Sequence, residues 1–108
     1  MELTMKESVQ DDQHFLYVAG EIDAYTVPRL RERLLALVSV PERRRVTVDL
    51  QEVEYIDSTG IGAFVAAMKA CKQSGSVLEV QNLSPRVERL FRITGLYERI
   101  VPHKGENH

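Results

Sequence analysis

The segment Tyr55-Ile56-Asp57-Ser58-Thr59-Gly60-Ile61-Gly62 places small polar side chains and glycines between two apolar stretches. The stretch before it predicts a strand and the stretch after it a helix, so the segment lies at a helix N-terminus. There the first backbone N–H groups lack intrahelical partners and the helix dipole is positive. A hydroxyl can cap such a helix, and a phosphate on it would be well accommodated. The residue types alone favour the simpler interpretation of an N-cap at Asp57 or Ser58 with Gly60 as a turn residue.

A second polar segment, Gly20-Glu21-Ile22-Asp23-Ala24-Tyr25-Thr26, separates a predicted strand from the first predicted helix. Turn and cap chemistry is enough to explain its composition. Glu21 and Asp23 have the oxygen ligands that a cation prefers, but two acids without a third ligand nearby make a weak magnesium site. Tyr25, if exposed in this loop, is better suited to anchoring a protein contact.

Neither segment predicts catalysis. The residue two before Ser58 is Ile56 and not the glycine of a G-x-S-x-G nucleophile elbow, and no histidine falls in a segment that supplies a base. Gly60-Ile61-Gly62 lacks the third glycine of G-x-G-x-x-G and the Gly-Lys-Ser/Thr ending of a P-loop. We therefore expect no enzymatic activity, no nucleotide or metal site and no cofactor.

Apolar patterning predicts the strands that position these segments. Leu3 to Val9 and Phe15 to Ala19 form an antiparallel hairpin around the turn Gln10-Asp11-Asp12-Gln13, the second strand being largely covered on both faces. The β-branched run Val46 to Leu50 predicts a central strand, and Val77 to Val80 predicts another.

Helical spacing predicts three helices between and after these strands. The first runs from about Val27 toward Pro41, the second continues from the Ser58 segment to a cap at Gly75, and the third runs from Ser84-Pro85 to Gly95. A last short strand or helical turn follows, and then a frayed tail. The order of elements predicts an α/β fold with a small mixed sheet and helices packed mainly on one side.

Length and composition point to a single domain over residues 1–108, with an ordered core of about 2–102. The net charge is -2 and the basic residues are scattered except for Arg43, Arg44 and Arg45, which we interpret as a solvated loop, so no nucleic-acid partner is expected.

The single cysteine excludes an internal disulfide and fits a reducing cytoplasm. No apolar run approaches the ~20 residues that a bilayer crossing needs, so no membrane partner is expected.

Four short motifs resemble those of the STAS-domain anti-anti-sigma factors, most closely the antagonists of bacterial stress and sporulation control. They are Gly20-Glu21-Ile22-Asp23, Asp57-Ser58-Thr59-Gly60-Ile61-Gly62, Asn82-Leu83-Ser84 and Thr94-Gly95-Leu96. Each motif is short, but their order and their separation by a helix and a strand extend the resemblance over nearly the whole chain.

This resemblance implies a partner-switching cycle. The unmodified antagonist binds an anti-sigma factor that is also a serine kinase and so frees a sigma factor; phosphorylation releases the antagonist, and a metal-dependent serine phosphatase restores it. The family's acceptor falls on Ser58, with Thr59 as a rival hydroxyl. The implied contacts lie on the exposed face of the second helix and at Asp23, Ala24, Tyr25, Thr26, Asp57, Ser58, Thr59, Gly60, Ile61 and Gly62.

Other members of such a family would have a different role. A stressosome-like scaffold subunit or a transporter-associated regulatory subunit would share the fold without a sigma-factor cycle. We also expect a monomer or weak dimer. At Gly60 we expect valine to impair phosphorylation more than folding, because a side chain there would crowd the kinase or strain the turn.

Overall fold

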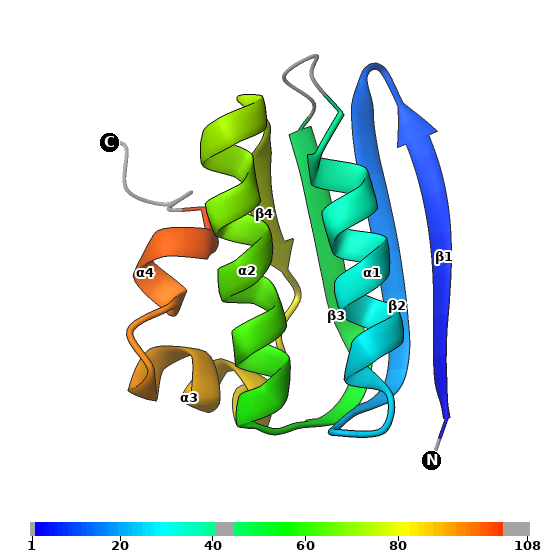
Figure 1. The fold of residues 1–108 in the computed structure, drawn as a ribbon. Coiled ribbons are helices and arrows are strands. Elements are labelled where there is room, and N and C mark those ends of the chain that lie inside the picture. Colours follow the sequence, from blue (N-terminus) through cyan, green and yellow to red (C-terminus); the bar gives the residue numbers. More distant parts are fainter. Residues whose placement is uncertain (1, 41–44, 103–108) are drawn as a thin grey trace.

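The computed structural model describes residues 2–40 and 45–102. Their elements are β1 (Leu3–Gln10), β2 (Gln13–Ile22), α1 (Val27–Val38), β3 (Arg45–Ile56), α2 (Ser58–Ser74), β4 (Val77–Gln81), α3 (Pro85–Ile93) and α4 (Tyr97–Ile100). The strands form one sheet in the order β1-β2-β3-β4, with β1 antiparallel to β2 and the other pairs parallel. Helices α1 and α2 lie side by side over one face of this sheet, and α3 and α4 lie on the outer side of α2 (Figure 1). The predicted α/β fold is confirmed.

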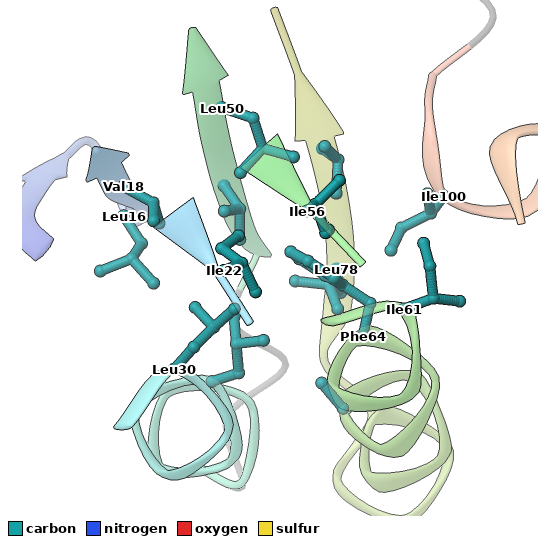
Figure 2. Close-up of a cluster of buried hydrophobic side chains, with 14 of the residues drawn as sticks. Leu16, Val18, Ile22, Leu30, Leu50, Ile56, Ile61, Phe64, Leu78 and Ile100 are labelled. Atoms are coloured by element: carbon teal, nitrogen blue, oxygen red, sulfur yellow. The ribbon is translucent and has the colours of Figure 1, made fainter. Parts of the chain in front are cut away.

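The hydrophobic core lies between the sheet and helices α1 and α2, and Figure 2 shows its side chains pointing into that space. Successive strand residues point to opposite faces, so Leu16 and Val18 face the helices and are buried, while Tyr17 faces away. Phe64 of α2 meets Phe91 of α3 edge to face, with ring centroids 5.5 Å apart. This aromatic contact joins α3 to the same core.

Strands β2 and β3 are longer than the apolar runs that predicted them. They continue to Ile22 and Ile56, which pair with each other, and register shifts between Tyr17 and Ala19 and between Gly20 and Glu21 hide the continuation from simple alternation. The second polar segment therefore begins inside β2 and not after it. The expectation that both faces of β2 are largely covered is wrong, because α1 and α2 cover one face only and Tyr17 is 40% exposed on the other.

Local polar residues fix the helix boundaries as the sequence predicted. The Asp57 side chain caps α2 by accepting a hydrogen bond from the Thr59 N–H, and Gly75 ends this helix at φ 83°. The Ser84 side chain caps α3 by accepting from the N–H of Val87 at 3.3 Å. Each of these contacts spans only a few residues, which explains why the sequence was sufficient to predict them.

The segments around the arginine run and the C-terminus differ from expectation or lie outside the described residues. Arg45 begins β3 and pairs with Glu79 at 2.8 Å, so it is not part of a solvated loop. Arg43, Arg44 and the tail 104–108 lie outside the described residues. Of the two alternatives for the last element, the helical turn is the one formed, as α4.

Gly60 lies in the first turn of α2 and is buried against the ends of β2 and β3. A Cβ at this position would meet Ile22 Cγ2 at 2.7 Å and Ile56 Cγ1 at 2.7 Å, distances that require both core side chains to shift. Gly62, in the same helix, has nothing within 4 Å of such a Cβ. The expectation that a side chain at Gly60 impairs phosphorylation more than folding is therefore reversed, because packing against the isoleucines is disturbed first.

We predict opposite effects of alanine at these two glycines. Gly60→Ala should lower the free energy of unfolding by about 1–3 kcal/mol, because it overpacks the core. Gly62→Ala should raise it by up to about 1 kcal/mol, because alanine favours the helix and has open space there. Urea unfolding of both variants provides the measurement. A free energy of unfolding for Gly60→Ala that equals or exceeds the wild-type value would mean that Gly60 has room for a side chain.

Candidate partner-binding site

The two polar segments of the sequence meet at one edge of the sheet. Strands β2 and β3 are parallel, so the loops that follow them leave at the same end, which is also where α1 and α2 begin (Figure 1). The N–H of Asp57 donates to the carbonyl of Ile22 at 3.2 Å and links the two chain segments directly. The structure thus brings the loop 23–26 next to the start of α2.

The loop between β2 and α1 is held by hydrogen bonds of its own. Asp23 Oδ1 accepts from the N–H groups of Tyr25 and Thr26 at 2.9 and 3.0 Å, which is the pattern of an Asx turn. Thr26 Oγ1 accepts from the Asp23 N–H at 2.9 Å and donates to the Glu21 carbonyl at 2.8 Å. These bonds leave Tyr25 91% exposed. The loop is therefore a fixed support for one projecting aromatic side chain.

The two neighbouring hydroxyls at the start of α2 have different surroundings. Thr59 donates to Asp57 Oδ1 through its N–H at 3.0 Å and also through its own hydroxyl. Ser58 is exposed, and its hydroxyl has no hydrogen-bond partner among the residues that the structure describes. Because Asp57 performs the capping, the alternative of Ser58 as N-cap does not hold, and Ser58 occupies the first helical position.

The predicted contact residues divide into those that reach the surface and those that support it. Ala24, Tyr25, Ser58, Thr59 and Gly62 are exposed, and Asp23 and Asp57 are half-buried. Three others are buried: Thr26, Gly60 and Ile61. Sequence reasoning did not separate these groups, and it missed the carbonyls of Glu21 and Ile22, which are main-chain acceptors with no side-chain signal.

The other two motifs of the sequence make structural contacts before and after α3. Asn82 Nδ2 donates to Asp49 Oδ2 at 2.8 Å, and Gln81 donates to the same oxygen at 3.0 Å, so a carboxylate that is only 8% exposed is satisfied. Thr94 Oγ1 donates to the Leu90 carbonyl at 3.0 Å at the end of α3. These contacts help to position α3.

The candidate site has the composition of a protein-contact surface. Within the described ranges, no three His, Cys, Asp or Glu residues are grouped so that they could hold a metal ion. Cys71, the one thiol, is buried in the core, and this burial raises the pKa of the Cys71 thiol. No helix in these ranges has the length and apolar character needed to cross a bilayer. What the surface offers is an exposed hydroxyl beside an exposed tyrosine.

Comparison with known proteins identifies the family to which the chain is similar. Residues 5–107 match the model of the STAS domain. The chain is 45% identical over 101 residues to the anti-sigma-B factor antagonist of Listeria monocytogenes, covering 93% of this chain and 88% of that protein. It is 39% identical over 105 residues to the anti-sigma-B factor antagonist of Staphylococcus aureus, covering 97% and 96%.

A solved structure gives the same result. The crystal structure of an anti-sigma factor antagonist from Mycobacterium paratuberculosis superposes with a TM-score of 0.77 at 25% identity, covering 95% of this chain and 88% of that chain. The sheet and the helix arrangement are therefore those of a known fold. With the family model matching almost the entire sequence, the chain belongs to the STAS-domain family.

Proposed function

We propose that this chain is an anti-sigma factor antagonist controlled by phosphorylation of Ser58. The unphosphorylated form binds an anti-sigma factor that is also a serine kinase, and a sigma factor is thereby freed. The single observation that carries the choice of residue is the exposed Ser58 hydroxyl without a hydrogen-bond partner among the described residues, at the start of α2. The names of the Listeria and Staphylococcus relatives support the partner class.

The hydrogen bonds around Asp57 favour Ser58 over Thr59 as the acceptor. A kinase needs a hydroxyl whose proton can pass to a catalytic base while its oxygen attacks the γ-phosphate. The Thr59 hydroxyl donates to Asp57, so its reaction would first require the loss of this charge-assisted hydrogen bond. Ser58 has no such bond to break.

Phosphorylation of Ser58 acts on binding and leaves the fold in place. The phosphate adds about -1.5 to -2 charges at neutral pH, and the positive end of α2 tolerates them. Against a partner fitted to a neutral hydroxyl, the same group adds bulk and desolvation cost, and it lies beside the carboxylate of Asp57. The complex therefore dissociates although the antagonist stays folded.

The rest of the cycle belongs to the same proposal. We assign the return step to a metal-dependent serine phosphatase and place the whole cycle in the cytoplasm, with residues 1–108 acting as one STAS domain. The chain contributes the phosphate acceptor and the binding surface, while the kinase brings ATP and magnesium. No catalytic role is assigned to this chain.

Substitutions at Ser58 should separate binding from stability. Ser58→Ala should bind the anti-sigma factor kinase as the wild type does and resist release by ATP, whereas Ser58→Asp should bind at least several-fold more weakly, because one added charge mimics part of the phosphate effect. The free energy of unfolding of both variants should stay within about 0.5 kcal/mol of the wild-type value, because Asp57 is the cap of α2. Asp57→Ala should lower this free energy by about 0.5–2 kcal/mol. Titration calorimetry and urea unfolding measure the two effects.

The matching control for the acceptor is Thr59→Ala, which should still incorporate one phosphate when incubated with the kinase and ATP. Mass spectrometry of the peptide containing residues 57–62 locates the group. Phosphate on Thr59, or on the Ser58→Ala protein, would defeat the assignment of Ser58. Equal binding of Ser58→Ala and Ser58→Asp would show that charge at position 58 does not control partner binding.

Tyr25 should be a main anchor of the complex. An exposed aromatic residue on a fixed loop gains a large buried area on binding at little entropic cost, so Tyr25→Ala should raise the Kd for the kinase by about tenfold or more. Unfolding should change little, because Tyr25 is 91% exposed. Tyr17→Ala, on the sheet face turned away from the helices, is the control and should keep the wild-type Kd. If both variants bind equally well, the loop is not part of the interface.

A further inference from the structure

A groove between α2 and α4 lies away from the Ser58 edge. Its volume is about 250 Å³, and it is lined by Val65, Met68, Lys69, Lys72, Leu96 and Arg99. The apolar members form the floor, with Leu96 buried and Val65 and Met68 partly buried, while the three cationic side chains are exposed. An apolar floor with a cationic rim differs from an ordinary solvated helix face, which would be polar throughout.

No ion pair neutralises the cationic rim among the residues that the structure describes. The ion pairs in the part of the chain that the structure describes involve Arg33, Arg45 and Arg92, and none involves Lys69, Lys72 or Arg99. Lys72 alone has a local reason for its position, since a cation in the last turn of α2 is favoured by the helix dipole. The dipole of α2 does not explain Lys69, which lies before the last turn of α2, or Arg99, which belongs to α4. A chain with a net charge of -2 thus presents a local positive surface.

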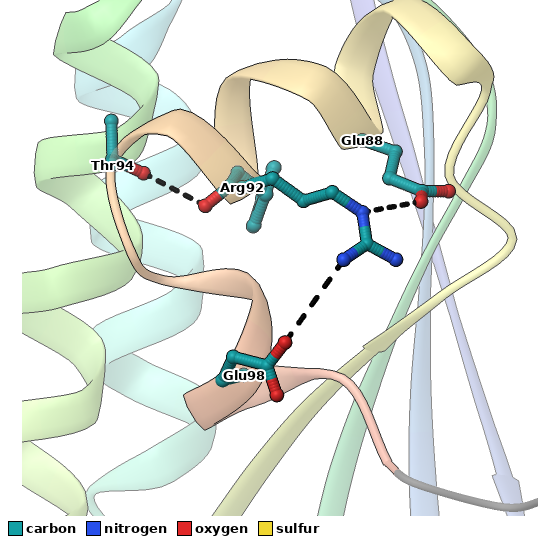
Figure 3. A network of polar contacts seen from close by, with 5 residues as sticks. Glu88, Arg92, Thr94 and Glu98 are labelled. Atoms are coloured by element: carbon teal, nitrogen blue, oxygen red, sulfur yellow. Dashed lines mark hydrogen bonds and ion pairs between the residues drawn. The ribbon is translucent and has the colours of Figure 1, made fainter.

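The wall of the groove formed by α4 is held in place. Arg92 of α3 hydrogen-bonds Glu88 at 2.7 Å and reaches Glu98 of α4 at 4.0 Å (Figure 3), and its guanidinium lies 3.8 Å from the centre of the Tyr97 ring. The hydrogen bond that Arg92 donates to Glu88 raises the pKa of Arg92, so the guanidinium stays charged at any physiological pH. Glu98, the acid of α4, reaches toward Arg92, while Arg99 is exposed and lines the groove.

We propose that this groove binds an acidic segment of a partner protein, with an apolar side chain inserted on the floor and flanking carboxylates paired with Lys69, Lys72 and Arg99. A small free anion would make no use of the apolar floor, and a flat anionic surface would not enter a hollow between two helices. Charge complementarity and the apolar floor together select an acidic peptide.

This second surface is separate from the phosphate acceptor. Lys69 lies three turns along α2 from Ser58, roughly 16 Å at the rise of an α-helix, and that exceeds the screening length of about 8 Å at physiological salt. A phosphate on Ser58 therefore changes the field in the groove little. The inference does not depend on the proposed partner-switching cycle.

The test uses the full chain and defined peptides. The acidic peptide EELEDLEE should shift the backbone NMR signals of residues 65–72 and 96–100, and binding should weaken as salt is raised to about 0.5 M. The triple substitution Lys69→Gln, Lys72→Gln and Arg99→Gln should raise the Kd roughly tenfold, as expected from three exposed ion pairs. The matched control Arg31→Gln, Arg86→Gln and Arg89→Gln removes equal charge from exposed positions on α1 and α3 and should leave the Kd unchanged.

Two further probes distinguish other occupants. The peptide EESEDSEE keeps the charge without the leucines and should bind several-fold more weakly, and phosphatidylglycerol vesicles should not retain the protein. Equal affinity for the two acidic peptides would overturn the apolar insertion. If vesicles retain the wild-type protein but not the Lys69→Gln, Lys72→Gln, Arg99→Gln variant, the groove binds a lipid surface instead of a peptide. If the peptide shifts NMR signals only in other helices, the binding site lies elsewhere.

Discussion

Parallel hydrogen bonding between β2 and β3 brings Ile22 and Ile56 to the same edge of the sheet, and the chain leaves that edge at both points. The bond from the Asp57 N–H to the Ile22 carbonyl extends this pairing by one step and fixes where α2 begins. Since α1 and α2 both start here, the loop 23–26 and the first turn of α2 form one surface (Figure 1). Without this contact, Tyr25 and Ser58 would belong to unrelated turns.

At this edge of the sheet, the residues that hold the start of α2 in place differ from the residue that is exposed. Asp57 caps the helix and holds Thr59, while Gly60 lets the first turn approach Ile22 and Ile56 closely. Ser58, which lies between Asp57 and Thr59, therefore neither caps the helix nor packs in the core, and it is exposed to solvent. This arrangement explains physically how the charge on one side chain can change at the start of a helix without affecting the core beneath it.

Helix α2 joins the two candidate surfaces. Its N-terminus follows the cap Asp57 and carries the exposed Ser58, and its later turns contribute Lys69 and Lys72 to the groove beside α4. The interior face of the same helix is packed against the sheet through Phe64 and its neighbours, so the two surfaces stay at a constant separation (Figure 2). Screening keeps them electrostatically independent, because their separation along the helix is about twice the Debye length.

The sequence by itself determined the features that depend on near neighbours. Contacts between residues a few positions apart set the helix caps at Asp57 and Ser84 and the end of α2 at Gly75. Patterns of residue types therefore reveal these boundaries and the order of strands and helices. The family motifs also followed from the sequence, since they are short and ordered along the chain. The extra length of β2 was hidden because register shifts interrupt its alternation.

Only the tertiary structure decided which residues reach the surface. Thr26, Gly60 and Ile61 belong to the predicted contact segments, yet packing between distant strands and helices buries them. The sequence could not distinguish Ser58 from Thr59 either, because both are small hydroxyl residues and the difference is the direction in which Asp57 accepts its hydrogen bonds. The groove beside α4 likewise exists only where two helices far apart in sequence meet, and a linear pattern carries no record of such a contact.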